Sequence, residues 1–396
     1  MGVNKLCKCS RPSINCYFQQ FTKRRCTPYG MENGQCNTVA KNKPPVSIEK
    51  EIRPISLTPI AAKVFESIIM KWVDETIEGE IDAKQFGGIT PVSTTDVLVE
   101  LVHMWYKATD KLNSYVTVVM LDFSKAFDLI NHHLLLDKLQ SYGLPAHILR
   151  WVATFLLDRA QLVKIGNEYS HSGHPNGGVP QRTLSGPKCF LVYINDLRTT
   201  VPLYKYVDDS TLFEICDKND VSVIQESVDI AARWTEQNDM KIYSEKSKEI
   251  LISFAQDGNF RSTIPNIKID GRDIAQVCHP KLLGMTISQD LTCNKHVNNI
   301  VKKAGKRLYM LFQLKRAGIT QKDLVSVYVS VVRPVLEYAC HVWHTSLPQY
   351  LSDNIVVIKR ALKCIFSGFG YAEILTRVNL DTLNVRRAAF VKNILI

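Results

Sequence analysis

The chain has 396 residues, of which 45% are hydrophobic and 22% charged, and its formal net charge is +11. This composition is ordinary for a soluble globular protein, and the length allows two or three domains. No window offers the roughly 18 uninterrupted apolar residues of a membrane-spanning helix, and the first residues lack the apolar core of a signal peptide. We therefore expect an intracellular protein, nuclear or cytoplasmic, that is neither secreted nor inserted in a membrane.

The first 50 residues differ in composition from the rest of the chain. They are rich in Cys, Lys, Asn and Pro and have no apolar period, so we expect a loosely ordered extension over residues 1–50. Five of the eleven cysteines lie there: Cys7, Cys9, Cys16, Cys26 and Cys36. A zinc knuckle is the alternative, but the spacings are irregular and no histidine precedes His103. The remaining cysteines are expected to be reduced and buried.

Charged residues are unevenly distributed along the chain. Lys and Arg are in excess in residues 1–50 and 291–396, whereas residues 51–290 contain more Asp and Glu than Lys and Arg. This pattern suits a protein that grips a polyanion at its edges and collects cations at its centre. A chance excess of surface lysines explains the charge equally well.

The region after residue 50 opens with two predicted helices and a strand. A helical apolar pattern follows RPISLTP (53–59), and STTD (93–96) has the form of a second helix start. YVTVVMLDF (115–123) is dense in β-branched and apolar residues and predicts a buried strand that runs into Asp122.

Further elements follow in the middle of the chain. LYKYVDDSTLF (203–213) predicts two strands joined by a tight turn that carries Asp208 and Asp209. The other expected elements are helices near 131–142, 145–158 and 220–238, a strand at 249–254, and a hairpin at 267–274 with Asp270-Gly271 at its turn. A polar, Gly-rich loop also leads to the apolar segment CFLVYINDL.

After residue 295 the apolar period predicts a mostly helical region. In KHVNNIVKKAGKRLYMLFQLKR the apolar residues form a stripe, and Lys302, Lys303 and Lys306 lie off it. A helix that lies along a nucleic-acid backbone is one interpretation, and a solvated basic face is the other.

The paired aspartates at one turn repel each other and need compensation. If Asp122 converges on Asp208 and Asp209, two divalent cations roughly 3.5–4 Å apart would cancel the repulsion, activate an attacking hydroxyl and stabilise a leaving phosphate oxygen. Mg²⁺ suits such a site because it takes carboxylate and phosphate oxygens together. A solvated turn is the simpler interpretation of the pair alone, but the aspartate at the end of the upstream strand weakens it.

Taken in order, these motifs resemble the reverse transcriptase of non-LTR retrotransposons, the LINE and jockey-like elements. The motifs that carry the resemblance are RPISL (53–57), QFGG (85–88), DFSKAF (122–127), GGVPQRTLSGP (177–187), YVDD (206–209), NDMKIYSEKSK (238–248) and KLLGMTI (281–287). The resemblance implies an α/β right-hand polymerase. Fingers and a palm with an antiparallel sheet would occupy residues 51–290, and a basic helical thumb and C-terminal region residues 291–396.

The resemblance also implies roles for individual residues. Asp122, Asp208 and Asp209 would hold two Mg²⁺ ions, with Mn²⁺ as an alternative and the backbone carbonyl of Phe123 assisting. The other implied roles are exclusion of a 2′-hydroxyl by Phe127, triphosphate contact by Arg53, support of the incoming nucleotide by Gln181, proton donation to pyrophosphate by Lys246, and a primer grip by KLLGMTI. A core aromatic is the alternative for Phe127, and ordinary surface side chains are the alternative for the others. His132 and His133 are expected to be structural.

The expected activity is RNA-directed DNA polymerisation, with an RNA template, a DNA primer and deoxynucleotides as partners. We expect endonuclease activity from another source, since no such domain is recognisable here. Arg182 stands where the family has glycine, and Lys188 where it has an apolar residue. Ser185 and Tyr243 also depart from the pattern, and the region from VWH (342–344) onward matches the family without a known mechanism. The alternatives are a degenerate remnant that at most binds nucleic acid, and a fragment that does not fold stably.

Overall fold

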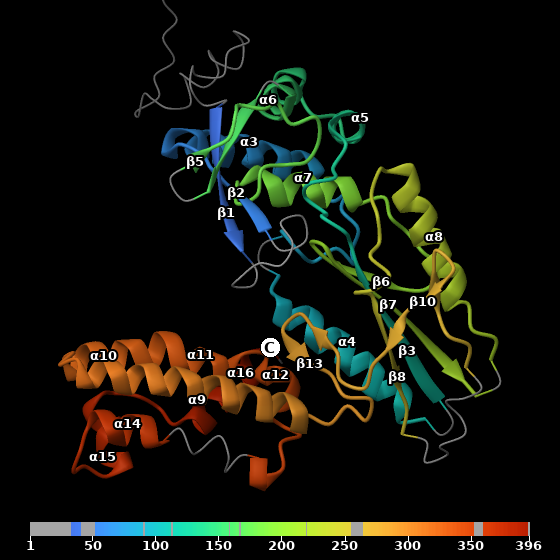
Figure 1. Ribbon diagram of the computed structural model, residues 1–396. Helices are drawn as coiled ribbons and strands as arrows, with labels where there is room; N and C mark the ends of the chain where they lie inside the picture. The colour runs from blue at the N-terminus through green and yellow to red at the C-terminus, as the bar shows by residue number, and fades with distance from the viewer. Residues whose placement is uncertain are drawn as a thin grey trace, which may run out of the picture. The chain divides into compact units, whose positions relative to one another are not determined.

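The computed structural model describes residues 33–40, 52–89, 92–111, 114–157, 159–165, 168–218, 220–254, 264–351 and 359–394 (Figure 1). Four of the five N-terminal cysteines, and with them the zinc-knuckle alternative, lie outside these ranges. Within the described ranges we find no helix whose length and apolarity would suffice for a membrane span. The chain divides into two compact units: unit 1 contains Met1–Gly88, Phe123–Arg198 and Ile230–Ile242, and unit 2 contains Ile89–Asp122, Thr199–Asp229 and Tyr243–Ile396.

Unit 1 contains a four-stranded sheet in the order β2-β1-β4-β5. Its strands are β1 (Asn33–Ala40), β2 (Ile52–Leu57), β4 (Ala160–Ile165) and β5 (Glu168–Tyr169). β1 pairs antiparallel with β2 and parallel with β4, and β4 pairs antiparallel with β5. β1 therefore lies within the segment expected to be loosely ordered. Its strand form depends on two partners that are remote in the sequence, which local composition does not reveal.

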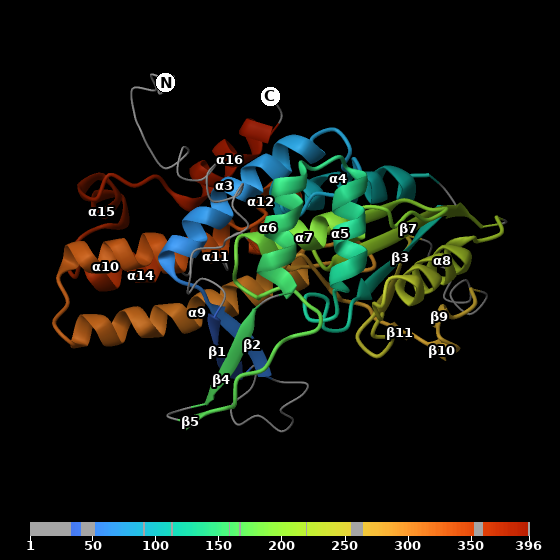
Figure 2. The ribbon, with the colours of Figure 1, turned by 90° about the horizontal axis from the view of Figure 1, so that it is seen from above.

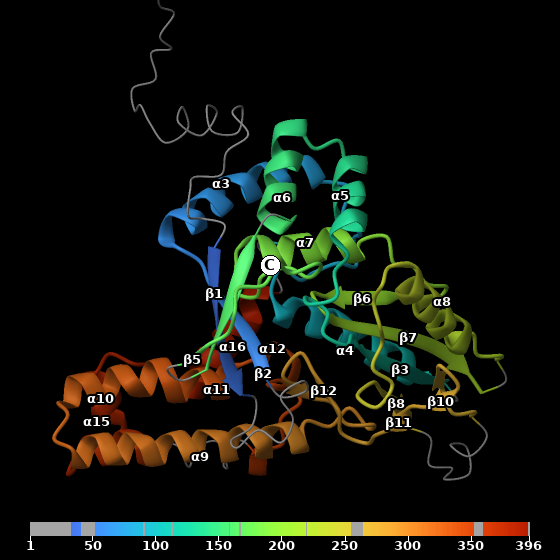
Figure 3. The ribbon, with the colours of Figure 1, turned by 45° about the horizontal axis from the view of Figure 1, so that its top comes forward.

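In the described part of this unit, the helices that lie entirely within it are α3 (Ile60–Ile77), α5 (His132–Ser141), α6 (Ala146–Leu157) and α7 (Ser185–Ile194). α3 follows RPISLTP as its apolar period predicts, and it buries Ile69, Val73 and Ile77 on one face. α7 contains most of the apolar segment CFLVYINDL, and all its side chains from Cys189 to Ile194 are buried. Figure 3 shows α5 and α6 side by side, and α5 also packs on α7.

Unit 2 is built on a five-stranded sheet in the order β11-β8-β3-β7-β6. Its strands are β3 (Ser114–Asp122), β6 (Leu203–Tyr206), β7 (Asp209–Asp217), β8 (Lys248–Ile252) and β11 (Ala275–Gln276). All neighbours are antiparallel except β11, which pairs parallel with β8. The α/β fold class is thus confirmed, and the sheet is antiparallel apart from the short edge strand β11, which makes it mixed. β3 is central, which explains its almost continuous apolar sequence.

Helix α4 (Thr94–Thr109) packs on β3 and begins where STTD predicts. Ser93 caps it: its hydroxyl accepts a hydrogen bond from the Asp96 amide, and the Asp96 carboxylate accepts one from the Ser93 amide at 2.7 Å. The indole of Trp105, fully buried, meets Phe213 of β7 edge-on at 6.2 Å between ring centroids. α8 (Ile224–Gln237) spans the boundary between the two units.

The remaining strands of unit 2 form two small hairpins. β9 (Lys268–Ile269) and β10 (Arg272–Asp273) join through Asp270 and Gly271, both with positive φ, as an Asp-Gly turn predicts. β12 (Lys281–Leu282) and β13 (Met285–Thr286) join through Leu283 and Gly284, also both with positive φ.

The C-terminal part of unit 2 is helical, as expected. Its elements are α9 (Asn294–Arg316), α10 (Gln321–Val327), the π-helical turn η2 (Tyr328–Val332), α11 (Arg333–Glu337), α12 (Cys340–Trp343), α14 (Lys359–Ile365), α15 (Tyr371–Arg377) and α16 (Leu383–Ile394). α9 runs alongside α10 (Figures 1 and 2). The Arg307 guanidinium of α9 donates to the Val331 carbonyl in η2, which links α9 to the π-helical turn.

Candidate active site

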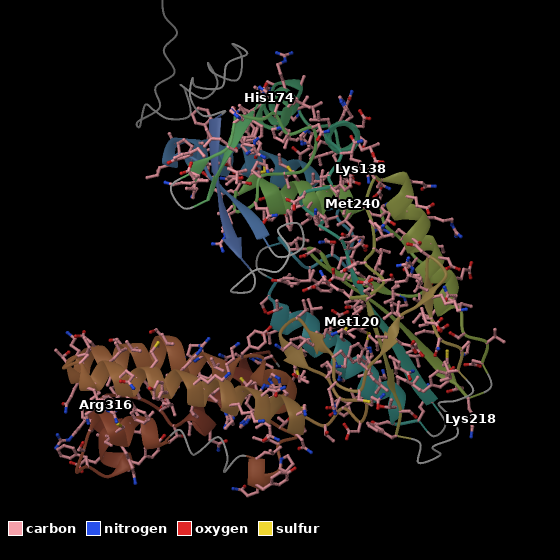
Figure 4. All side chains as sticks on the ribbon, in the orientation of Figure 1. Met120, Lys138, His174, Lys218, Met240 and Arg316 are labelled. Atoms are coloured by element: carbon pink, nitrogen blue, oxygen red, sulfur yellow. The ribbon has the colours of Figure 1, made fainter. Side chains whose placement is uncertain are left out.

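Asp122 and Asp209 lie directly opposite each other on neighbouring strands of unit 2. The register of β3 and β7 runs from Ser114 opposite Asp217 to Asp122 opposite Asp209, and Tyr206 of β6 is the next partner in the same row. Opposite residues of an antiparallel pair project from the same face. Met120, labelled in Figure 4, lies on this face two residues before Asp122. The sheet register therefore brings the two carboxylates together.

A two-residue turn carries Asp208 between β6 and β7. The first turn residue, Val207, has a φ of 57°, and Asp208 does not have a positive φ, which is the pattern of a type II′ hairpin turn. A β-branched residue in the left-handed region is strained by about 1–3 kcal/mol. The turn holds the consecutive aspartates at the end of the hairpin in one fixed backbone conformation.

The two neighbouring carboxylates perturb Asp209. Desolvation by the surrounding protein, then the charges of Asp208 and Asp122, raise the pKa of Asp209 to about 6, although part of this side chain remains exposed. In the part of the chain that the structure describes, no three His, Cys, Asp or Glu side chains are grouped tightly enough to hold an ion as they stand. The donor set nevertheless fits a divalent cation in kind, because carboxylate oxygens in mutual repulsion are the ligands that Mg²⁺ and Mn²⁺ take.

Ser247 fixes the end of β3 against the loop that follows residue 242. The Asp122 amide donates to the Ser247 hydroxyl at 3.1 Å, this hydroxyl donates to the Tyr243 carbonyl at 3.1 Å, and the Tyr243 amide donates to the Asp122 carbonyl at 2.7 Å. Ser247 is fully buried. We did not single it out from the sequence, where its only signal is its place in SEKSK.

Within unit 1, Phe123 forms an isolated bridge with Ile242. The amide of Ser124 donates to the Lys241 carbonyl at 2.7 Å in this bridge. This pattern makes Phe123 and Ile242 a non-hydrogen-bonded pair, so the bridge does not use the Phe123 carbonyl. The Phe123 carbonyl therefore accepts no hydrogen bond from Ile242 in this bridge.

Lys246 belongs to the same loop as Ser247. Its amide donates to the Tyr243 carbonyl at 3.0 Å, and its ammonium lies 4.5 Å from the centroid of the Tyr243 ring. The Tyr243 hydroxyl donates to Glu245 at 2.8 Å. Tyr243, which departs from the family's usual Asn, therefore supports the exposed Lys246 side chain.

In unit 1 the loop after β3 is joined to the Gly-rich loop before α7. The Val179 amide donates to the Phe127 carbonyl at 2.7 Å, and the Gln181 side chain donates to Asp128 at 2.9 Å. Gly178 must be glycine, because it has a φ of 80° and a Cβ there would lie 2.7 Å from the Asp128 carbonyl oxygen. The half-buried Phe127 ring packs on Phe190 at 5.2 Å between ring centroids. The structure thus brings Phe127 and Gln181 together.

Glu66 of α3 holds the other end of this Gly-rich loop. It is fully buried, and one carboxylate oxygen accepts from the Leu184 amide at 2.8 Å and from the Ser185 amide and hydroxyl at 3.1 Å each. Ser185, a departure from the usual Leu, thereby gains a partner. We did not predict this contact, and its only signal in the sequence is an acidic residue on the apolar face of a predicted helix.

The two charged departures from the family pattern have different environments. Arg182 is exposed and has a φ of 67°, so it occupies a left-handed conformation that glycine adopts without strain. Lys188 is half-buried, but its ammonium lies 2.7 Å from an Asp74 carboxylate oxygen and donates to the Gly88 carbonyl at 2.6 Å. The charge of Lys188 is therefore compensated.

The remaining candidates lie in several places. Arg53 is on β2 opposite Val39, and its side chain is not among those that the structure describes. His132 is buried with Nε2 2.7 Å from the Gly178 carbonyl, and burial lowers its pKa, while His133 is exposed. This environment suits a structural role for His132. The Lys side chains at positions 302, 303 and 306 are all exposed on α9.

A family described as "Reverse transcriptase (RNA-dependent DNA polymerase)" matches residues 39–287. A protein of Drosophila melanogaster described as a probable RNA-directed DNA polymerase from transposon X-element is 26% identical over 370 residues, which cover 90% of this chain and 40% of that protein. The RNA-directed DNA polymerase from mobile element jockey of the same species is 25% identical over 332 residues, covering 79% and 35%. The chain thus spans about two-fifths of the length of these relatives.

Solved structures of telomerase are also similar to this chain. Telomerase from Candida albicans, solved in complex with a fragment of telomeric RNA, is 11% identical with a TM-score of 0.48 over 92% of this chain and 68% of that one. Apo telomerase from Candida tropicalis is 10% identical with a TM-score of 0.46 over 95% and 72%.

Proposed function

Because the chain belongs to the reverse transcriptase family, we propose that it is the RNA-directed DNA polymerase of a non-LTR retrotransposon. It would extend a DNA primer on an RNA template by transferring nucleotides from deoxynucleoside triphosphates. The observation that carries this proposal is the row of Asp122 and Asp209 on adjacent strands, with Asp208 at the turn and the pKa of Asp209 raised by desolvation and then by both neighbouring charges.

We propose that Asp122, Asp208 and Asp209, assisted by the Phe123 carbonyl, hold two Mg²⁺ or Mn²⁺ ions. When bound, such a pair activates the primer 3′-hydroxyl and stabilises the charge on the leaving pyrophosphate. The hydrogen bonds through Ser247 keep Asp122 at a fixed position for this task. Deprotonation of Asp209 must precede metal binding, so we expect activity to fall as the pH drops below about 6.

Four other residues would act on the nucleotide. We propose that the Phe127 ring excludes a 2′-hydroxyl, that Gln181 supports the incoming nucleotide, that Arg53 contacts the triphosphate through its forked donors, and that Lys246 donates a proton to pyrophosphate. The bonds between the two loops of unit 1 support the first two roles, since they hold Phe127 and Gln181 in a defined arrangement. The ring of Tyr243 beside the Lys246 ammonium supports the last.

The duplex would be held by unit 2. We propose that Lys302, Lys303 and Lys306 on α9 bind the phosphates of the template–primer duplex, and that hairpin β12–β13 holds the primer end. The exposure of all three lysines on one helix supports the first part. Binding of this kind weakens steeply as the salt concentration rises.

A second candidate function is nucleic-acid binding without catalysis. The observation that favours it is Arg182, whose left-handed backbone and long side chain occupy the glycine position of the nucleotide loop. The basic face of α9 would still retain a duplex in such a protein.

Primer extension on poly(rA)/oligo(dT) with Mg²⁺ tests the proposal. The control is the double variant Asp208→Asn/Asp209→Asn, which keeps the turn but removes both charges. We expect incorporation by the wild-type chain and none by the control. A folded wild-type chain that binds the duplex in a salt-dependent manner but incorporates no nucleotide would instead establish the second candidate.

A further inference from the structure

The turn of hairpin β12–β13 is held by a side chain from far along the sequence. The Tyr338 hydroxyl donates to the Leu283 carbonyl and lies 3.1 Å from the Thr94 hydroxyl at the start of α4. A Cβ on Gly284 would lie 3.3 Å from the Tyr338 ring, so the ring rests against the glycine. All four residues belong to unit 2. Tyr338 thus contacts both residues of the turn and connects them to α4, the helix that packs on β3.

Two further side chains from α9 hold the strand after this turn. The imidazole Nδ1 of His296 accepts a hydrogen bond from the Thr286 amide at 3.3 Å, and the Asn299 side chain donates to the Thr286 hydroxyl at 3.2 Å. His296 is almost completely buried. Hydrogen bonds from residues outside its two short strands therefore hold the hairpin at its turn, through Tyr338, and at β13, through His296 and Asn299.

The residues that follow Tyr338 in the segment YACHVW (338–343) fix its backbone. Ala339 has a φ of 50°, which turns the chain sharply between α11 and α12. The fully buried Trp343 indole donates to the Tyr338 carbonyl at 3.0 Å, and its ring lies 6.0 Å from the His296 ring and 5.2 Å from the Arg387 guanidinium. Trp343 joins the Tyr338 and His296 contacts into one cluster. The two elements α12 and β13 lie near each other in Figure 1.

We propose that Tyr338 is a positioning residue for hairpin β12–β13, with Trp343 as the anchor that holds it in place. A two-strand hairpin with two residues in each strand has little stability of its own, so its position depends on these outside contacts. This inference rests on the proposed function in one respect: the hairpin that Tyr338 positions is the one proposed to hold the primer end. It gives Trp343, which lies in the region from VWH (342–344) onward that had no mechanism from the sequence, a specific task.

The first test needs no catalytic activity. In Tyr338→Phe the ring still covers Gly284, but the bonds to Leu283 and Thr94 are lost. We expect amide hydrogen exchange across residues 281–287 to accelerate by about tenfold, the equivalent of one hydrogen bond, with no change in the amides of β3 and β7. The matched control is Tyr350→Phe, which removes an exposed hydroxyl bonded to Asn294 at 3.1 Å and should leave the hairpin unchanged. Unchanged exchange in Tyr338→Phe would overturn the inference.

The second test links the hairpin to the primer. We expect Tyr338→Phe to weaken binding of a recessed primer–template duplex severalfold, measured by fluorescence anisotropy, and to raise the KM for primer–template while the KM for the deoxynucleotide stays constant. A general structural defect would change both KM values and the binding of a blunt duplex. If the recessed and blunt duplexes weaken equally, the link to the primer end is wrong.

These tests separate the inference from the proposed function. A wild-type chain that neither extends nor binds a primer–template would refute the proposed function and the primer link with it. The exchange measurement would still decide whether Tyr338 positions the hairpin.

Discussion

Replacing Asp209 by Asn should stabilise the protein at neutral pH. The folded state raises the pKa of this carboxyl from 3.8 to about 6, mainly by desolvation and then by the charges of Asp208 and Asp122. Between about pH 4 and pH 6 the folded state therefore binds more protons than the unfolded state, so stability falls as the pH rises through this window. Above pH 6 the full cost of the charged form is present. Asn has the shape of Asp without this charge.

The size of the effect follows from the shift. Two pKa units correspond to about 3 kcal/mol, but Asp209 is exposed to solvent, and screening reduces this to about 1 kcal/mol. Urea unfolding at pH 7 should show Asp209→Asn to be more stable by this amount, and unfolding at pH 4 should show no difference. A matched control is Asp273→Asn on hairpin β9–β10, an exposed aspartate whose loss should change stability by less than about 0.5 kcal/mol.

Added Mg²⁺ should reverse the order of the two proteins. A cation that binds the three carboxylates stabilises the folded wild-type chain by an amount that rises with the logarithm of the Mg²⁺ concentration once this exceeds the dissociation constant, and it should stabilise Asp209→Asn much less. The reasoning would be refuted if Asp209→Asn were less stable than the wild type at pH 7 without metal. It would also fail if Mg²⁺ stabilised both proteins equally.

Three other predictions concern the backbone of Arg182, the ion pair of Lys188 and the burial of His296. Arg182→Gly should raise stability by about 0.5–1 kcal/mol, because it relieves a left-handed residue, and should increase primer extension; a lower rate would show that Arg182 does not obstruct the site. Asp74→Asn should destabilise the protein by about 1–2 kcal/mol, because it leaves the Lys188 charge poorly compensated. Combining Asp74→Asn with Lys188→Met should recover this loss. If the changes in the free energy of unfolding of the two single variants simply added in the double variant, as measured by urea unfolding, the prediction would be wrong. Burial lowers the pKa of His296 to about 4, so stability should be constant above about pH 6.5 and fall as the pH drops towards 4, by up to about 3 kcal/mol. Relative to the wild type, His296→Asn should show a flatter pH dependence, and parallel curves would refute the assignment.

Local patterns in the sequence predicted most of the elements that form the site. β3 was recognisable because a central strand is apolar on both faces, and the hairpin of Asp208 and Asp209 because two apolar strands flank a polar turn. The capping box at Ser93 and the Asp270-Gly271 turn follow from side-chain and backbone preferences that act over two or three residues. Each of these features depends on neighbours along the chain.

The features that the sequence did not predict depend on distant partners. β1 is a strand because it lies between β2 and β4. β11 is parallel to its neighbour because the chain, after hairpin β9–β10, runs along β8 in the same direction as β8. Glu66, Ser247 and Tyr338 have their roles through hydrogen bonds to residues 55 or more positions away. No period or propensity marks Ser247 or Tyr338, because a single hydroxyl leaves no pattern in its own neighbourhood, and Glu66 is marked only as an acidic residue on an apolar helix face.

The ion pair between Lys188 and Asp74 constrains the order in which two substitutions can accumulate. Asp74 is partly open to water and is tolerable without Lys188, whereas Lys188 without Asp74 would leave a half-buried charge with only the Gly88 carbonyl to compensate it. A lineage that began with an apolar residue at position 188 could therefore acquire the aspartate first at little cost, but not the lysine first. Returning to the apolar residue is easy while the aspartate persists, and reverting the aspartate first is not. The pair thus fixes the order of the two exchanges in both directions: the aspartate must be present whenever the lysine is.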